Sequence, residues 1–123
     1  MGDVSKNFNS AEFACQGKDC CGGAAPIHPD LLAGVQALRD LVERPLHINS
    51  GFRCPKHNAA IGGVKNSYHM LAMAADIAVP SGMTPDDFAA FAEQVFVFHN
   101  GGIGIYASWI HVDIRKDKTR WRK

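Results

Sequence analysis

Apolar residues between positions 30 and 45 recur at the spacing of one helix face. Steps of four and three residues separate them, which is the period of an amphipathic helix: Leu31, Val35, Leu38 and Val42. Pro45 then stops the run, because proline cannot donate the amide hydrogen bond that a helix interior needs. The pattern predicts a helix over residues 29–43.

A second helical segment follows Thr84. Thr84 suits the helix cap, Pro85 suits the first helical position, and the carboxylates of Asp86 and Asp87 favour the positive end of the helix dipole. We expect this helix to end at residues 100–102 and to bury one apolar set: Phe88, Phe91, Ala92 and Val95.

Short apolar segments typical of strands lie between the helices. They cover residues 46–49, 75–79, 103–106 and 109–115, and a short helix is predicted over 55–60. Strands and helices do not alternate regularly, as a parallel doubly wound sheet would require. We expect an α+β fold, a single small domain with a largely antiparallel sheet flanked by helices.

The two ends of the chain differ from this pattern. Residues 1–28 are rich in Gly, Cys and polar side chains and predict an irregular wrap. Residues 116–123 are basic with one Trp, and a solvated tail is favoured over contact with an acidic polymer. A chain of 123 residues supports one hydrophobic core, so residues 1–123 are interpreted as one domain.

Composition excludes some classes of partner. Thirteen Lys and Arg against 12 Asp and Glu leave a net charge of +1, which is too little to hold a nucleic acid by its phosphates. No apolar stretch approaches the roughly 20 residues of a membrane span. The first residues lack the basic and apolar regions of a secretory signal, which leaves the location open. We expect a monomer.

Four cysteines are unevenly placed. Cys15, Cys20 and Cys21 crowd the N-terminal segment, and Cys54 stands alone. They could form two disulfides, a structural zinc site or free thiols. The spacing lacks the paired C-x2-C that is typical of a zinc ribbon. Separately, we expect that no cysteine binds a catalytic metal, because a thiolate added to three ligands would occupy the position of the water.

Metal-capable side chains interrupt apolar runs at three places: His69, Asp76 and the pair His111 and Asp113. A buried Asp76 needs a partner or a cation. His111 and Asp113 share one face of a strand because side chains two apart point the same way. Two His and one Asp form a standard Zn²⁺ ligand set with a free fourth position, but a capped loop and ordinary buried hydrogen bonds would also explain these residues.

A longer series of motifs runs in order through the chain. It comprises Ser50-Gly51-Phe52-Arg53-Cys54-Pro55, Ser67-x-His69-x6-Asp76, and Gly101-Gly102-Ile103-Gly104-Ile105-Tyr106 before Trp109-Ile110-His111-Val112-Asp113. From about Phe13 to Trp121 the chain resembles the M15 family of zinc peptidases that cleave bacterial peptidoglycan. It looks closest to small, often phage-encoded, D-alanyl-D-alanine carboxypeptidase-like and murein endopeptidase-like domains, whose fold is similar to that of hedgehog signalling domains.

The resemblance implies roles for particular residues. It implies that His69, Asp76 and His111 hold one Zn²⁺, that Arg53 binds substrate or the developing oxyanion, and that Ser67 supports the site. Peptidoglycan stem peptides would be the substrate, hydrolysed by a metal-activated water.

The chain departs from the family pattern at two positions. Ala72 replaces a usual Gly, and Ser108 stands where several branches place an acidic general base. Asp113 is the remaining acidic candidate, either as the base or as a partner that orients a zinc ligand.

Other functions remain as alternatives. The missing acid at Ser108 favours a zinc-bearing, catalytically inactive cell-wall-binding module, and a phage structural domain is a further possibility. A hydrolase built on Cys54 and His57 is disfavoured, because the sequence offers no third group to orient the pair.

Overall fold

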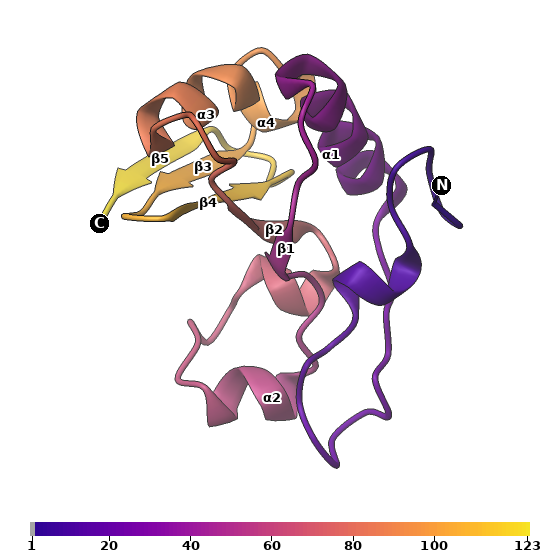
Figure 1. Cartoon of the computed structure of the whole chain (residues 1–123). Coiled ribbons are helices and arrows are strands. Elements are labelled where there is room, and N and C mark those ends of the chain that lie inside the picture. The colour runs from indigo at the N-terminus through magenta and orange to yellow at the C-terminus, as the bar shows by residue number, and fades with distance from the viewer. Residues whose placement is uncertain (1) are drawn as a thin grey trace.

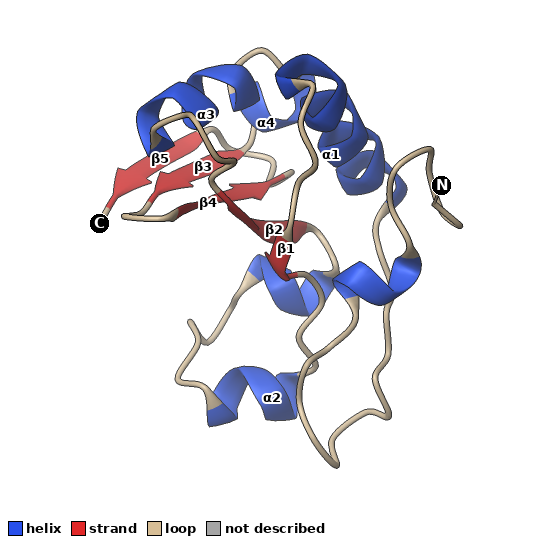
Figure 2. Cartoon of the chain, in the orientation of Figure 1, coloured by secondary structure: helices blue, strands red, loops and turns tan. Residues whose placement is uncertain are grey.

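The computed structural model describes residues 2–123 and shows a five-stranded sheet with three helices packed on one face, α1 (Pro29–Val42), α3 (Pro85–Ala92) and α4 (Phe96–His99) (Figures 1 and 2). The strand order is β1-β2-β4-β3-β5, and every neighbouring pair is antiparallel except β3 and β5. The α+β prediction is confirmed; Met1 lies outside the described residues. The strands are β1 Ile48–Ser50, β2 Ala74–Ala78, β3 Gly102–Ile105, β4 Trp109–Asp113 and β5 Thr119–Arg122.

Helix α1, Pro29–Val42, forms where the apolar spacing predicts it. The His28 side chain caps its first turn by accepting the Asp30 amide hydrogen, at 3.1 Å. The helix ends at the cap residue Glu43, which takes the left-handed conformation with φ 54°. Glycine is the usual residue in this position, since a Cβ there meets the backbone.

Glu43 provides a clean test of this helix end. Because Glu43 is exposed, Glu43→Gly should relieve the strain and stabilise the protein by about 1 kcal/mol, raising Tm by about 4 °C. Thermal unfolding checks this against Glu43→Ala, which removes the same charge but keeps the Cβ. An equal gain in both variants would attribute the effect to charge and contradict the account.

The prediction of one long helix after Thr84 is wrong in one respect, because this segment forms two helices. Helix α3 covers Pro85–Ala92 and starts with the expected Thr84 cap, whereas α4 covers Phe96–His99. The amides of Gln94 and Val95 donate to carbonyls only three residues back, which tightens the end of α3. Val95, a β-branched residue, then takes an extended backbone and starts α4.

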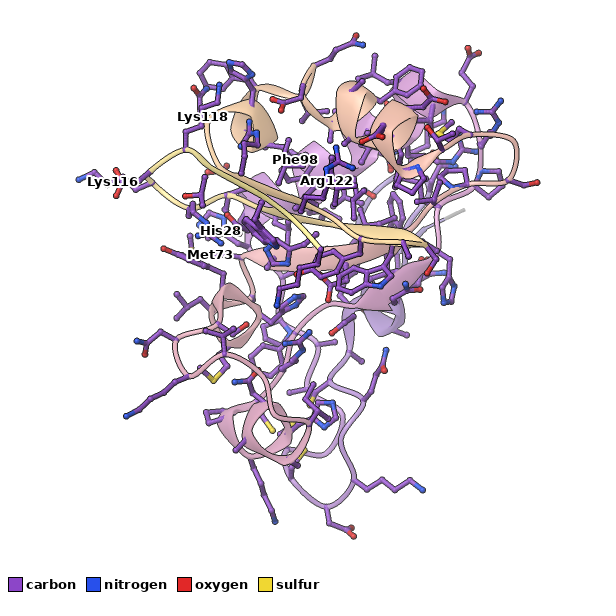
Figure 3. All side chains as sticks on the ribbon, turned by 90° about the vertical axis from the view of Figure 1, so that its left-hand side faces the viewer. His28, Met73, Phe98, Lys116, Lys118 and Arg122 are labelled. Atoms are coloured by element: carbon purple, nitrogen blue, oxygen red, sulfur yellow. The ribbon has the colours of Figure 1, made fainter. Side chains whose placement is uncertain are left out.

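The sheet has one apolar and one polar face. Its apolar face packs on the three helices, and Figure 3 labels Phe98 of α4 in this layer. Alternate strand residues belong to that core: Ile48, Ala75, Ile77, Ile103, Ile110 and Val112. The residues between them point to the opposite face, which α2 (Pro55–Ala60), two short 3-10 turns and the N-terminal wrap only partly cover (Figure 1).

The irregular N-terminal wrap anchors itself with aromatic side chains. It contains one 3-10 turn, η1 (Ser10–Phe13), and its Phe8 and Phe13 rings are each 1% exposed, with centroids 5.9 Å apart. The Phe52 amide donates to the Phe13 carbonyl at 2.8 Å. The wrap is therefore bound to the chain just after β1.

The prediction of a solvated C-terminal tail is wrong for residues 119–122. These residues form β5, which pairs in parallel with β3. Arg120 and Arg122 point to the side of the sheet that carries the helices. Arg120 binds Glu93 at 2.7 Å, and Arg122 binds Asp86 at 2.6 Å. Trp121 points to the opposite, polar face. None of the helices within residues 2–123 has the length and hydropathy of a membrane span.

Candidate metal centre

Three residues predicted from the sequence meet on the polar face of the sheet. His69 comes from the 3-10 turn η2 (Tyr68–Leu71), Asp76 from β2 and His111 from β4, where Asp76 and His111 are directly paired. Their exposed fractions are 2%, 5% and 9%. One ligand atom from each lies within 4.8 Å of the others, so the fold gathers two imidazoles and a carboxylate at one point.

His69 is held with one ring nitrogen free. Its Nδ1 lies 2.7 Å from the Gly51 carbonyl, which fixes the proton on Nδ1 because a carbonyl only accepts. Its backbone amide donates to Ser67 Oγ at 3.1 Å. Nε2 lies 3.3 Å from Asp76 Oδ1 but is not aligned for a hydrogen bond, and it is buried without a partner. In the neutral tautomer with the proton on Nδ1, this buried Nε2 has a free lone pair, which is the arrangement that a metal ligand needs.

His111 lies between two carboxylates. Its Nδ1 is 2.9 Å from Asp76 Oδ1, and its Nε2 is 2.7 Å from Asp113 Oδ2. Burial acts to lower the pKa of His111, but the bonds to Asp113 and Asp76 outweigh burial and raise it. Burial likewise acts to raise the pKa of Asp76, yet the hydrogen bond from His111 lowers it to about 2, with a smaller contribution from the proximity of His69. The site thus favours positive charge between its carboxylates, as a divalent cation would supply.

Asp113 is fully buried, and both of its oxygens are occupied. Oδ1 accepts from the Gly102 amide at 2.9 Å and from Arg115 Nε at 2.9 Å, and Oδ2 accepts from Arg115 at 2.6 Å besides facing His111. Burial opposes ionisation, but the bonds from His111 and Arg115 hold the pKa of Asp113 well below its usual range. A Cβ on Gly102 would lie 2.5 Å from this carboxylate, so only glycine leaves room for it.

Arg53 approaches the centre from the segment that follows β1. One terminal nitrogen lies 3.2 Å from Asp76 Oδ2, and the rest of the guanidinium donates to Ser50 Oγ and Asn58 Oδ1, also at 3.2 Å. These bonds orient a side chain that is 14% exposed. Arg53 therefore presents a fixed positive charge beside the carboxylate.

A cavity of about 490 Å³ opens over these residues. Ser67 and Arg53 line it together with the three metal-capable residues. Among residues 2–123, Asp76 is the only acidic side chain on its wall, because Asp113 is buried against His111 and does not line the cavity. Four aromatic residues complete much of the lining: Tyr68, Tyr106, Trp109 and Trp121.

Trp121 is a site residue that the sequence reasoning missed. Its ring centroid lies 5.0 Å from that of His111, and its Nε1 donates to the Tyr106 hydroxyl at 2.9 Å. The ring lies against β3 at Gly104, where a Cβ would approach it to 2.3 Å. The alternation of Thr119, Arg120, Trp121 and Arg122 is the signal that could have predicted a strand here.

The two departures from the family pattern lie in different environments. Ser108 is exposed in the turn between β3 and β4 and does not line the cavity. Ala72 ends η2 with φ 58°, which explains why glycine suits this position.

Cys54 lies apart from the cavity. Its sulfur contacts Cys15 at 3.8 Å, and it accepts the backbone amide hydrogen of His57 at 3.5 Å. The described residues therefore place no cysteine sulfur at the centre of His69.

Comparison with known protein families gives a match that covers the residues of this centre. A search of the curated proteins finds no match to the chain. A family model described as Peptidase M15 matches residues 6–113, which include every residue of the predicted metal centre and end at the last residue of β4. Because the match spans most of the sequence, the chain belongs to the peptidase M15 family.

Proposed function

We propose that this protein is a zinc-dependent peptidase that hydrolyses peptide bonds in bacterial peptidoglycan, in a D-Ala-containing stem peptide or a cross-link. The observation that carries the proposal is the buried group of His69, Asp76 and His111 with an unpartnered His69 Nε2, on the floor of a cavity. Membership of the peptidase M15 family supports the same chemistry.

The ligand atoms follow from the hydrogen bonds. His69 would bind zinc through Nε2, since Nδ1 donates to Gly51. His111 would bind through Nδ1 once Nε2–H donates to Asp113, and Asp76 would bind through Oδ1, which lies nearest to both rings. When bound, zinc supplies a Lewis acid that polarises the scissile carbonyl and acidifies water.

Asp113 has the contacts of a positioning residue. Its oxygens are occupied by His111, Arg115 and Gly102, so it would hold the His111 tautomer that leaves Nδ1 free. We assign Asp113 this role in preference to that of general base, because a base must reach the attacking water in the cavity.

Arg53 and Ser67 support the centre in different ways. Arg53 would bind a substrate carboxylate or stabilise the oxyanion that forms on the scissile carbonyl, since its charge lies at the cavity wall. Ser67 would fix the backbone of η2, and with it His69, through its hydrogen bond to the His69 amide.

The test of the proposed function is hydrolysis of defined muropeptides by the zinc-loaded protein. We expect mass spectrometry to detect release of D-Ala from a pentapeptide or separation of a cross-linked dimer. Arg53→Ala should lower this rate by about 10²–10³-fold, as expected for loss of an oxyanion or substrate contact. Arg44→Ala, an exposed arginine outside this cavity, is the matched control and should retain the rate. Equal rates in the two variants would remove Arg53 from the site.

One observation favours a second candidate, a zinc-bearing cell-wall-binding or phage structural module without turnover. Apart from Asp76, the described residues place no acidic side chain on the cavity wall that could act as a base. In that case the protein would bind peptidoglycan and zinc but leave every muropeptide intact.

A further inference from the structure

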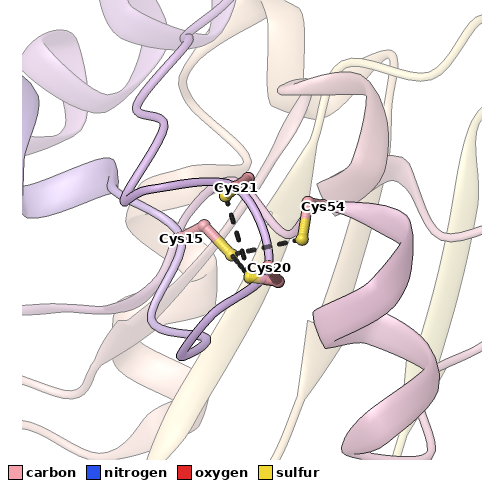
Figure 4. A group of neighbouring side chains, drawn as sticks. All are labelled: Cys15, Cys20, Cys21 and Cys54. Carbon is pink, nitrogen blue, oxygen red and sulfur yellow. Dashed lines mark hydrogen bonds between the residues drawn. The ribbon is translucent and has the colours of Figure 1, made fainter.

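The four cysteines gather at a second point, outside the cavity described above. Cys15, Cys20 and Cys21 come from the N-terminal wrap and Cys54 from the residue before α2, and Figure 4 shows their sulfurs turned toward one another. Cys15 Sγ lies 3.8 Å from Cys54 Sγ and 3.9 Å from Cys20 Sγ, and Cys20 Sγ lies 3.8 Å from Cys21 Sγ. All four sulfurs lie within 4.8 Å of one another.

These separations match a tetrahedral thiolate site. Four sulfurs about 2.3 Å from one zinc ion lie about 3.8 Å from each other. The sulfurs are not grouped into two pairs, since Cys15 is as close to Cys54 as to Cys20 within 0.1 Å. A disulfide would instead bring two sulfurs to about 2.05 Å and separate them from the other two.

The surrounding backbone is shaped around the sulfurs. The His57 amide donates to Cys54 Sγ at 3.5 Å, a contact that favours the thiolate form. A Cβ on Gly17 would lie 2.7 Å from Cys20 Sγ, so glycine allows the loop to pass close to that sulfur. Gly22 and Gly23, with φ of 69° and 75°, turn the chain directly after Cys21.

We propose that Cys15, Cys20, Cys21 and Cys54 bind a second Zn²⁺ ion as four thiolates. Each thiol releases its proton to solvent as the metal binds, and no electron is transferred. Four protein ligands leave no position for water, so this site is structural. The proposal does not depend on the peptidase activity.

The zinc would join the wrap to the segment that carries Arg53. Cys54 directly follows Arg53, whose amide donates to the His69 carbonyl at 3.1 Å. On the wrap side, the Cys15 amide donates to the Ala24 carbonyl at 2.8 Å and closes the loop that holds Cys20 and Cys21. A metal at the cysteines would thus hold both the wrap and the chain beside the cavity in place.

The experiment separates the two metal centres. In the His69→Ala/His111→Ala variant, produced with Zn²⁺ and freed of loose metal, we expect one tightly bound zinc per chain. Co²⁺ substituted into this variant should give the intense sulfur-to-metal absorption of a tetrahedral thiolate site. All four thiols should resist alkylation until a chelator removes the metal, and all should react afterwards.

A cysteine variant gives the reciprocal result. Cys21→Ser, which changes a half-buried ligand, should lose the sulfur-to-cobalt absorption pattern of four thiolates and expose the remaining thiols to alkylation. The double histidine variant with no bound zinc and freely alkylated cysteines would overturn the proposal. So would an intact mass showing disulfides in the freshly purified protein. Neither outcome bears on the centre of His69, so failure here is distinguishable from failure of the proposed peptidase.

Discussion

Replacement of His69 by alanine should remove zinc from the proposed peptidase centre and lower turnover by about 10³-fold or more, because the Lewis acid is lost with it. The variant loses the buried Nε2 that has no other partner, and it leaves the Gly51 carbonyl without its donor. The second effect should cost about 1–3 kcal/mol of stability. Zinc content, muropeptide hydrolysis and thermal unfolding measure the three effects separately.

His47→Ala is the matched control for this variant. His47 is exposed and lies outside the cavity, so its removal should change neither zinc content nor rate. A folded His69→Ala protein that keeps full zinc at this centre and full activity would show that the ligand assignment is wrong.

The second large effect is expected for Asp113→Asn. Asparagine keeps the shape but removes the charge that binds Arg115 and orients His111. We expect a loss of about 10–100-fold in zinc affinity or activity, as for other groups that orient a metal ligand. Breaking the buried ion pair should also destabilise the fold by roughly 3 kcal/mol. Zinc titration, hydrolysis rates and denaturant unfolding test these expectations.

The same variant separates the two roles considered for Asp113. A fall of about 10²–10⁴-fold in turnover with zinc affinity unchanged would identify a general base and contradict the positioning role. Asp117→Asn, at an exposed residue four positions later, is the control and should behave as the unmodified protein.

Much of the fold could be predicted because it depends on local patterns. The apolar period of α1 and the Thr84-Pro85 start of α3 are properties of short segments, and both elements form. The same-face placement of His111 and Asp113 also follows from strand geometry, and their contact at 2.7 Å agrees with it. The expectation that His69 and Asp76 lie close to His111 depends on their spacing together with the family resemblance.

The missed features depend on contacts between distant segments. The four-residue alternation of Thr119–Arg122 is too short to predict β5 by itself, because the strand forms through pairing with β3 and the Arg120–Glu93 ion pair, both made with distant segments. Both Asp113 oxygens accept hydrogen bonds because the folded chain brings the Gly102 amide and the Arg115 guanidinium to them. The cysteines lack the usual C-x2-C spacing, and only folding brings Cys54 to the wrap.

The most direct test of the proposed peptidase is a muropeptide profile of purified peptidoglycan after incubation with the zinc-loaded protein, with the His69→Ala/His111→Ala variant run in parallel. We expect the unmodified protein to shorten stem peptides by D-Ala or to convert cross-linked dimers to monomers, and the variant to leave the profile unchanged. An unchanged profile with the unmodified protein, when zinc is bound at His69, Asp76 and His111, would contradict the peptidase and favour the binding module.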